Sequence, residues 1–387
     1  MHPRFLEIMF IGQYILKVVS RCNLNCSYCY VYNREDQSWR DQPAFMSKDT
    51  MRVAFGRIVE HARAQEKGEV LLILHGGEPL LGGVPILQAF ADEVRSVFVG
   101  TGLTVHAAIQ SNGLLYTEEI GEFLEANNIS MGVSVDGPPR MNDRYRVDHA
   151  GRGSSHALQE KLSRMRGRCF FNGFLVVIDV DNDPVEIFDY LRQFDPPGID
   201  ILLPDDNLDR RPKGKPTLLK RATPYGDWMI RLFDHLWRRG EARTRIRFFD
   251  SIINGLLGRG SVVESTGNVA AGIVVVEADG SIGASDALKS AFQGATNTGL
   301  NVFEHSFDDA ARHPKIAPHQ GGTKVLCEAC TGCELVTVCG GGYLPHRYSS
   351  AQGFDNPSVY CADLEKLIRH VGAVVYEHLR EVQAEVV

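Results

Sequence analysis

Short apolar runs alternate with amphipathic stretches from Tyr14 to about Arg239. The apolar runs mostly lack a regular alternation of polar and apolar residues, which is typical of parallel strands whose two faces are covered by helices. Six of these runs predict strands, at residues 14–19, 70–74, 104–109, 129–135, 170–180 and 199–203.

Helical patterns lie between the predicted strands. They begin near Ser47, Val84, Thr117, Ser154 and Pro184, and a further helix is expected at 225–239. Thr117 with two acidic residues after it is a typical helix start, because carboxylates favour the first turn. Six strand–helix units joined by right-handed crossovers predict an α/β fold in the form of a partial (β/α)6 barrel. In such barrels the chemistry takes place at the C-terminal ends of the strands.

The pattern changes after Arg243 to short strand-like pieces, Gly-rich turns and a second group of cysteines. A last helix is expected at about 362–384. We therefore predict two consecutive domains, residues 1–240 and 241–387. The stretch 205–216 is rich in Asp, Pro and Arg and predicts a loop after the sixth strand, either a lid over the substrate or a plain surface excursion.

Composition and charge restrict the classes of function. The chain has 387 residues, 44% of them hydrophobic and 23% charged, which is ordinary for a globular protein with a full core. A net charge of -7 gives no electrostatic basis for nucleic-acid binding. No apolar run approaches the ~18 residues that span a membrane, and the N-terminus lacks the regions of a signal peptide. We therefore expect no membrane partner. The nine cysteines are odd in number and do not predict a disulfide framework, so we expect a cytoplasmic protein.

Three cysteines in eight residues carry the strongest chemical signal: Cys22, Cys26 and Cys29, followed at once by Tyr30. Three thiolates at this spacing can hold three irons of a [4Fe–4S] cluster and leave the fourth iron open to a small molecule. Three buried core cysteines or a zinc site are the alternatives, although zinc sites prefer paired C-x2-C spacings. The segment resembles the signature of radical S-adenosylmethionine (SAM) enzymes, in which SAM chelates the open iron.

Polar groups follow the next three predicted strands in the order that this family has. The resemblance implies that Gly76, Gly77 and Glu78 hold the amino group of SAM, with the glycines allowing close approach of the backbone. It also implies that Asn112 and Ser134 belong to the polar shell of SAM. Arg146 is the expected partner of a carboxylate, with Arg144 as the alternative, and Tyr30 is expected beside the adenine.

A second group of cysteines begins at Cys327 and continues with Cys330, Cys333 and Cys339, with Cys361 further on. The C-x2-C-x5-C spacing resembles the C-terminal SPASM domain of radical SAM peptide-modifying enzymes. The resemblance implies one auxiliary [4Fe–4S] cluster, with four ligands: Cys330, Cys333, Cys339 and Cys361. A zinc ribbon is the rival, because spacing alone does not choose the metal.

The ligands of a second, inner auxiliary cluster are missing from this pattern. Tyr343 stands where a further cysteine is usual, and Ser285 stands in place of the cysteine of a Pro-Cys-Asp sequence. We therefore predict two [4Fe–4S] clusters in all, one that binds SAM and one auxiliary. Cys327 is spare and is either an alternative to Cys330 or an ordinary thiol. Cys169 is expected in the core, because free cysteines are commonly buried.

Several further blocks resemble one subgroup of peptide maturases. They are 31–32 with 36–40, 248–253, 346–348 and 353–364. They are similar to FxsB-type radical SAM/SPASM proteins, whose relatives join an aromatic ring carbon to the Cβ of a nearby residue in ribosomally made peptides. The resemblance implies a cyclophane-forming enzyme with a precursor peptide as substrate and a flavodoxin or ferredoxin as electron donor.

Ring-to-Cβ bonding ends with the loss of an electron and a proton, which requires a base. Asp286 is the candidate, because it matches the acid that follows the missing inner-cluster cysteine, although a solvated turn carboxylate is equally compatible with its position. Asp205 and Asp206 are the weaker alternatives.

Other functions remain open at this point. Within radical SAM enzymes they are thioether formation, epimerisation and formylglycine formation. The sulfatase-maturing enzymes that form formylglycine resemble the full pattern of cluster ligands, and the missing inner-cluster cysteines of this chain count against that reaction. A non-catalytic iron–sulfur scaffold is the alternative outside enzymes, and Gly76, Gly77 and Glu78 count against it because a scaffold has no use for a SAM pocket.

Overall fold

The computed structural model describes residues 10–215, 222–240, 243–261, 263–267, 272–317 and 325–385. The N-terminal segment without signal-peptide features, Pro216 at the end of the predicted loop and the domain boundary at residue 241 lie outside these ranges. Among the described residues, no helix combines the length and the apolar character needed to cross a membrane.

The chain divides into two compact units. The first comprises Met1–Val133, Arg146–Phe171 and Gly272–Gln320, and the second comprises Ser134–Tyr145, Asn172–Ala271 and Gly321–Val387. These units interleave along the sequence, whereas the predicted domains follow one another, and the consecutive division stays a prediction.

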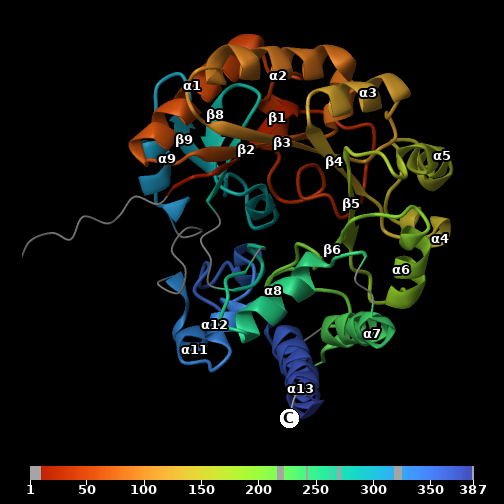
Figure 1. Ribbon diagram of the computed structural model, residues 1–387. Helices are drawn as coiled ribbons and strands as arrows, with labels where there is room; N and C mark the ends of the chain where they lie inside the picture. Colours follow the sequence, from red (N-terminus) through yellow and green to blue (C-terminus); the bar gives the residue numbers. More distant parts are fainter. Residues whose placement is uncertain are drawn as a thin grey trace, which may run out of the picture. The chain divides into compact units, whose positions relative to one another are not determined.

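Parallel strands form the centre of the first unit (Figure 1). Strand β2 (Glu69–Gly76) pairs in parallel with β1 (Gln13–Val19) and with β3 (Thr104–Ser111), and β3 pairs in parallel with β4 (Ile129–Ser134). On its other edge β1 pairs in parallel with β7 (Ile273–Val276), which continues antiparallel into β8 (Ser281–Gly283) and β9 (Asn297–Asn301). The apolar sequence of β7 thus completes the hydrogen bonding of β1, and residues from beyond position 241 join the first sheet.

The helices of this unit begin and end for local reasons. Ser47 caps α1 (Lys48–Ala64), because its side chain accepts a hydrogen bond from the N–H of Thr50, and Thr117 caps α3 (Glu118–Ala126) in the same way. Figure 1 shows α1 and α2 (Gly83–Phe98) side by side along the strands. The other helical elements of the unit are α5 (Ser155–Met165), α9 (Phe307–Arg312), η1 (Ser38–Asp41), η2 (Pro79–Gly82) and η3 (Asp286–Ser290).

The second unit contains the strands β5 (Phe171–Val177) and β6 (Ile199–Leu202), which pair in parallel. Helix α7 (Pro224–Arg239) ends at Gly240 in the left-handed conformation, a common helix stop because glycine has no Cβ to clash. The remaining helical elements are α4 (Pro139–Asn142), α6 (Pro184–Arg192), α8 (Arg247–Leu256), α11 (Glu328–Thr331), α12 (Val336–Cys339), η5 (Leu344–Arg347) and α13 (Cys361–Glu385).

The predicted order of strands and helices is confirmed within one to three residues at most of the ends. The largest difference is at the fifth strand, where β5 ends at Val177 rather than at residue 180. Beyond β6, the described part of the predicted loop 205–215 contains no helix or strand.

Candidate functional site

The cysteine loop follows β1 directly in the first unit. Cys22, Cys26 and Cys29 are not joined by disulfides, and the backbone N–H of Cys29 donates to the carbonyl of Cys26 in a tight turn at 2.9 Å. Burial raises the pKa of Cys22 to about 12 and also raises the pKa of Cys29. The thiol of Cys22 lies within electrostatic range of the thiols of Cys26 and Cys29. Because a metal binds thiolates and displaces their protons, such a group of neighbouring thiols suits an iron–sulfur cluster.

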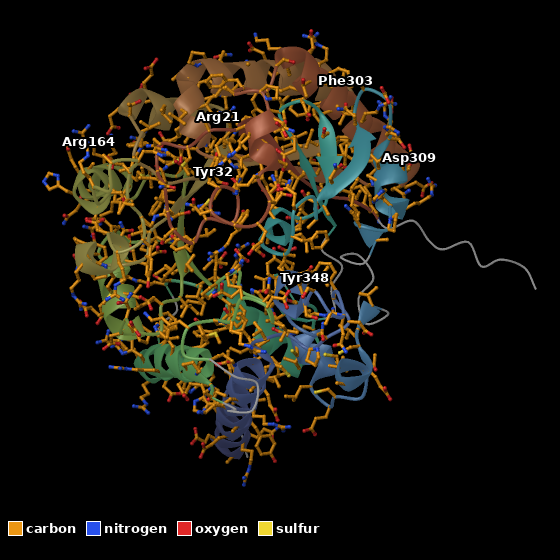
Figure 2. All side chains as sticks on the ribbon, turned by 180° about the vertical axis from the view of Figure 1, so that it is seen from behind. Arg21, Tyr32, Arg164, Phe303, Asp309 and Tyr348 are labelled. Atoms are coloured by element: carbon orange, nitrogen blue, oxygen red, sulfur yellow. The ribbon has the colours of Figure 1, made fainter. Side chains whose placement is uncertain are left out.

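Arg21 and Trp39 organise the segment around this loop, where Figure 2 labels Arg21 and Tyr32. The guanidinium of Arg21 donates to the carbonyl oxygens of Ser20, Trp39 and Gln42 at 2.8 to 3.2 Å. The ring of Tyr32 meets the ring of Trp39 edge-on at 4.8 Å. These contacts hold the cysteines in one conformation relative to the end of β1.

Gly76 and Gly77 pack against the same segment. A Cβ on Gly76 would lie 1.9 Å from the carbonyl oxygen of Val19, and one on Gly77 would lie 1.9 Å from the hydroxyl of Tyr32. The N–H of Gly77 also donates to the carbonyl of Val19 at 2.8 Å. The close approach that requires glycine here is therefore to the chain itself, and contact of these glycines with SAM stays a prediction.

Glu78 is buried and its carboxylate is hydrogen-bonded on both oxygens. Oε1 accepts from the N–H of Leu80 at 2.9 Å and from the hydroxyl of Ser111 at 2.7 Å, and Oε2 accepts from the N–H of Asn112 at 2.7 Å. Burial raises the pKa of Glu78, and the hydrogen bonds and the charge of Arg146 oppose that rise. A carboxylate has about four acceptor positions, so Oε2 retains one for an ammonium group.

Asn112 joins the end of β3 to the cysteine loop. Its side-chain N–H donates to the side-chain oxygen of Asn23 at 2.8 Å, while its own side-chain oxygen accepts from the N–H of Leu114 at 3.0 Å. Asn112 thus lies next to residues predicted to bind the cluster and SAM. Both the N–H and the oxygen of its side-chain amide form hydrogen bonds within the protein.

Arg146 contacts the cysteine loop, and the choice between Arg146 and Arg144 as the partner of a carboxylate stays a prediction. Arg146 is buried and donates to the hydroxyl of Tyr28, inside the cysteine loop, at 2.8 Å. Arg144 belongs to the second unit, where it forms an ion pair with Asp179 at 2.8 Å. Of the other predicted residues, Tyr30 is half-buried next to Cys29, and Ser134 is the last residue of β4.

Asp286 is buried in a group of charged side chains rather than exposed in a turn. Its carboxylate forms an ion pair with the ammonium of Lys17, and Lys289 lies 3.9 Å away. Burial alone would raise the pKa of Asp286, but the charges of Lys17 and Lys289 outweigh it and the pKa is lowered. Asp205 and Asp206 lie in the second unit, where Asp206 pairs with Arg210 at 3.0 Å.

Lys17 is a residue of this site that the sequence analysis did not single out. Its signal was a lysine inside the otherwise apolar run Tyr14–Val19, since a charge in a buried strand needs a partner. Lys289 is a second such residue: the structure shows it buried close to Asp286.

The second group of cysteines lies in the second unit. Cys327 precedes α11, Cys330 is in α11, Cys339 ends α12 and Cys361 begins α13. Burial raises the pKa of Cys330 to about 12, and the hydrogen bond that its thiol donates to Cys327 and the charge of Cys361 add to the effect. Burial also raises the pKa of Cys339 to about 11, with contributions from Cys361 and Cys333. All five thiols therefore lie within electrostatic range of one another as a group, and Cys327 directly contacts Cys330.

Within the described residues, no three Cys, His, Asp or Glu side chains converge tightly enough to hold a single metal ion. The thiols of each group are thus neighbours without forming a mononuclear site. A cubane cluster is larger than one ion, so its ligands need not converge as closely.

The two positions at which inner-cluster cysteines are missing make contacts within the protein. The hydroxyl of Tyr343 donates to the carboxylate of Glu264 in the second unit, where desolvation raises the pKa of that carboxyl group. In the first unit, Ser285 precedes Asp286, whose carboxylate is engaged by Lys17.

The prediction for Cys169 is wrong, because its side chain is exposed. It lies two residues before β5 begins, so the strand does not carry it into the core.

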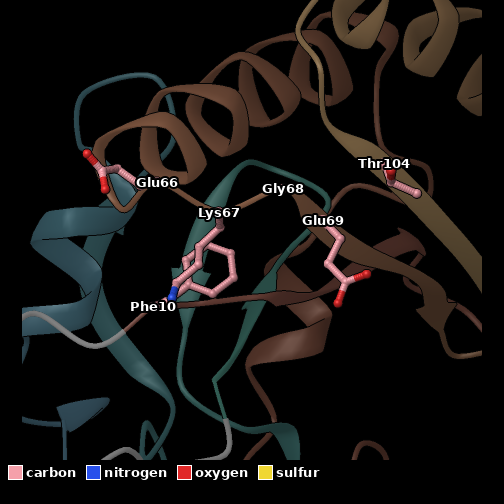
Figure 3. Close-up of a pocket in the computed structure, with 6 residues that line it drawn as sticks. All are labelled: Phe10, Glu66, Lys67, Gly68, Glu69 and Thr104. Carbon is pink, nitrogen blue, oxygen red and sulfur yellow. The ribbon is translucent and has the colours of Figure 1, made fainter.

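A pocket elsewhere in the first unit is not the candidate site (Figure 3). It is lined by Phe10, Glu66, Lys67, Gly68, Glu69 and Thr104. Glu69 and Thr104 are the first residues of β2 and β3, whereas Gly76, Glu78 and Asn112 lie at or beyond the ends of these strands. The pocket therefore lies at the opposite end of the strands from the cysteine loop.

Comparison with known proteins agrees with the fold and with the cysteine motif. Residues 16–191 match the family model of the radical SAM superfamily. A serine-type anaerobic sulfatase-maturating enzyme from Bacteroides thetaiotaomicron is 24% identical over 369 residues, which cover 90% of this chain and 86% of that enzyme. A cysteine-type enzyme from Clostridium perfringens is 25% identical over 357 residues, which cover 91% of this chain and 93% of that enzyme.

Solved structures have the same fold. Native anSMEcpe with bound AdoMet superposes with a TM-score of 0.80 at 21% identity, over 96% of this chain and 99% of that one. SuiB from Streptococcus suis, bound to the precursor peptide SuiA, has a TM-score of 0.56 at 15% identity, over 91% of this chain and 76% of that one.

The family match over residues 16–191 and the fold agree with a radical SAM enzyme, a class that uses SAM and a [4Fe–4S] cluster. The α/β fold class predicted from the sequence is confirmed. Within the superfamily, this chain is similar over nine-tenths of its length to the serine-type and cysteine-type sulfatase-maturating enzymes.

Proposed function

We propose that this enzyme oxidises a side chain of a peptide or protein substrate after removal of a hydrogen atom from Cβ. The observation that carries the proposal is the cysteine loop held against Glu78 and Asn112, in a chain similar over nine-tenths of its length to an enzyme that matures sulfatases.

Cys22, Cys26 and Cys29 would hold the first cluster. Glu78 would bind the amino group of SAM through the acceptor position left on Oε2. Gly76, Gly77, Asn112, Ser134, Arg146 and Tyr30 would complete the pocket. When bound, the cluster and SAM supply a carbon-centred radical that removes the hydrogen atom.

Cys330, Cys333, Cys339 and Cys361 would hold an auxiliary [4Fe–4S] cluster, which supplies a site for one electron. Tyr343 and Ser285 replace ligands that an inner cluster would need, and the contact of Tyr343 with Glu264 supports its absence. Asp286 is the proposed base, since a buried, ionised carboxylate can take a proton from the substrate.

Oxidation of a serine or cysteine to formylglycine is the reaction best supported by the relatives. For serine, Cβ loses a hydrogen atom, the hydroxyl loses a proton to Asp286, and one electron leaves, so that an aldehyde forms. The sum is the loss of two hydrogens.

Cyclophane formation is the second candidate. The blocks that resemble FxsB-type proteins and the missing inner-cluster ligands favour it. It also removes two hydrogens in total: a hydrogen atom from Cβ, then an electron and the ring proton after the ring carbon bonds to Cβ. Mass alone therefore does not separate the two reactions.

The test uses anaerobically reconstituted enzyme with SAM, dithionite and one of two probes. These are the short peptide encoded beside this protein and a synthetic peptide with a single serine. A product that has lost two hydrogens and reacts with a hydrazide contains an aldehyde and supports formylglycine formation. Loss of two hydrogens without hydrazide reaction, located by tandem mass spectrometry between a ring and a Cβ, supports the cyclophane.

A run in deuterated water completes the test. Deuterium gained at an α-carbon with no loss of hydrogens indicates epimerisation and contradicts both candidates. Absence of 5′-deoxyadenosine after full reduction would contradict the enzyme proposal and favour a scaffold.

The partners follow from this chemistry. We propose that a one-electron donor such as a flavodoxin or ferredoxin reduces the first cluster in the cytoplasm. A reducing compartment suits a chain whose nine cysteines are all free.

A further inference from the structure

Five charged or titratable side chains form one group in the first unit, here named the Lys17 cluster: Lys17, Asp286 and Lys289, which are buried, with His75 and Glu277, which are half-buried. Lys17, Asp286 and Lys289 are exposed by only 3%, 4% and 1%. Burying charges is costly unless they are paired, so the way in which these groups pair is informative.

The cluster consists of two ion pairs. Lys17 from β1 pairs with Asp286, and Lys289 pairs with Glu277 at 2.7 Å. The distance between Lys289 and Asp286 is 3.9 Å, so Lys289 is the weaker partner of Asp286. Lys17 is therefore the cation that contacts the proposed base.

The strands fix where Lys17 lies. Lys17 of β1 and His75 of β2 are register partners in the parallel sheet, and Lys17 Nζ lies 3.2 Å from His75 Nδ1. Removal from water and the charge of Lys17 lower the pKa of His75 to about 4. His75 Nδ1 also lies 3.2 Å from the carbonyl oxygen of Gly76, so it accepts a hydrogen bond from Lys17 in the neutral tautomer that carries its proton on Nε2.

We propose that Lys17 is a positioning residue that fixes the place and the ionised state of Asp286, so that Asp286 can take the proton released by the substrate. This inference rests on the proposed function, in which Asp286 is the base. In the step, the substrate O–H or ring C–H bond breaks, its proton goes to a carboxylate oxygen of Asp286, and Lys17 keeps its own protons.

The charge balance of the cluster supports this role. Two ammonium groups balance two carboxylates, so the cluster is neutral before the step and gains one positive charge when Asp286 is protonated. The other titratable groups within electrostatic range of the cluster are the neutral His75 from β2 and Asp36, which is near Lys289. The thiol of Cys29 is within range of Lys17, and the hydroxyl of Tyr32 is within range of Glu277. Without Lys17, Asp286 would be a buried carboxyl with one distant cation, and burial would favour its protonated form.

The first experiment needs no substrate. The Tm of the reconstituted enzyme is measured against pH for the wild type, Lys17→Met, Lys289→Met and the double variant Lys17→Met/Asp286→Asn. In the wild type the pKa of Asp286 is lowered, so its stabilisation is present above the unfolded pKa and is lost as pH falls through the folded pKa.

In Lys17→Met the pKa of Asp286 is expected to lie above the unfolded value. Its contribution then has the opposite sign, and stability relative to the double variant increases as pH falls from about 7 to 5. Lys289→Met is the comparison variant: it removes the partner of Glu277 and the weaker partner of Asp286, so its profile is expected to shift less than that of Lys17→Met. A Lys17→Met profile parallel to the wild type, with a shifted Lys289→Met profile, would overturn the inference.

The second experiment measures product formed per 5′-deoxyadenosine against pH, with the peptide that the wild type modifies. Lys17→Met is expected to lose product by at least about tenfold below about pH 6 while 5′-deoxyadenosine still forms. Lys17→Arg keeps the positive charge and is expected to form product at acidic pH as the wild type does. If Lys17→Met does not fold, Lys17→Arg is the test variant, and loss of its product at low pH would overturn the inference.

The two failures are distinguishable. If the wild type modifies neither peptide, the proposed function fails, and the Tm profiles still decide whether Lys17 controls Asp286. If the wild type makes product and Lys17→Met has the same pH profile, only the role of Lys17 fails.

Discussion

The carboxylate of Glu78 accepts a hydrogen bond from the backbone N–H of Asn112 at 2.7 Å, which ties the end of β2 to the end of β3. The side chain of Asn112 continues this connection to Asn23 in the cysteine loop. One buried carboxylate thus links the three segments that the sequence assigned to the cluster and to SAM. A change at Glu78 is therefore expected to weaken SAM binding more than it disturbs the cysteine loop.

Glu78→Gln is expected to weaken SAM binding. The charge that would face the amino group is lost, while the shape of the side chain and most of its hydrogen bonds are kept. Loss of a hydrogen bond to a charged group costs about 1.5–3 kcal/mol, which corresponds to roughly 10- to 100-fold in Kd. Equilibrium dialysis of SAM with the reconstituted enzyme measures the effect.

Glu93→Gln is the matched control, because Glu93 is also a buried glutamate of the first unit but pairs with Arg52 on a helix. It is expected to bind SAM as the wild type does. Equal Kd values for Glu78→Gln and the wild type would remove Glu78 from the SAM pocket.

The two groups of cysteines are expected to lose iron independently. Cys22→Ala should lose the iron of the first cluster and all 5′-deoxyadenosine formation, whereas Cys339→Ala should lose only the iron of the auxiliary cluster. Iron analysis and electron paramagnetic resonance of each reduced variant measure the loss. Cys169→Ala is the control, because this exposed thiol belongs to neither group.

Cys327→Ser distinguishes the two roles left open for that residue. Since the ligand set is complete with Cys330, we expect Cys327→Ser to keep the auxiliary cluster, although Cys327 contacts Cys330. Zinc bound in place of iron at these cysteines would support the zinc ribbon instead.

Asp286→Asn is expected to uncouple the two halves of the reaction. SAM cleavage does not need the base, so 5′-deoxyadenosine should still form, while product should fall by about 10²- to 10⁴-fold. Liquid chromatography with mass spectrometry measures both in one sample. Asp279→Asn, an exposed carboxylate in the turn between β7 and β8, should leave product unchanged, and undiminished product from Asp286→Asn would exclude this residue as the base.

The strands and helices up to α7 could be predicted because their signals are local. Short unbroken apolar runs such as the one in β2 favour a parallel strand covered on both faces, and caps such as Thr117 mark where a helix begins. The place of β7 could not be predicted in the same way. Its pairing with β1 joins residues about 260 positions apart, and nothing local in Ile273–Val276 specifies that partner.

The residues of the candidate site could be singled out for the same reason, and their roles stay predictions. The cysteines, Glu78 and Asn112 follow a spacing that can be read along the chain, and the structure brings them together with Arg146. The partner of Asp286 could not be read in this way. Lys17 precedes it by more than 260 residues, and only the folded sheet places the two side chains in contact.

Gly77→Ala is expected to disrupt the cysteine loop although glycine to alanine is a small change. The added Cβ would lie 1.9 Å from the hydroxyl of Tyr32 and 2.3 Å from the carbonyl oxygen of Arg21. The tyrosine can turn away, but the Arg21 carbonyl is backbone, and it also accepts the N–H of Glu78 at 2.9 Å. The segment that precedes Cys22 must therefore move, and we expect a loss of iron from the first cluster together with a lower Tm.

Gly56→Ala is the matched control, because nothing lies within 4 Å of its added Cβ in α1. It should keep its iron and gain about 0.5–1 kcal/mol of stability, as alanine favours a helix over glycine. A Gly77→Ala enzyme with full iron content and an unchanged Tm would show that the cysteine loop does not depend on this contact.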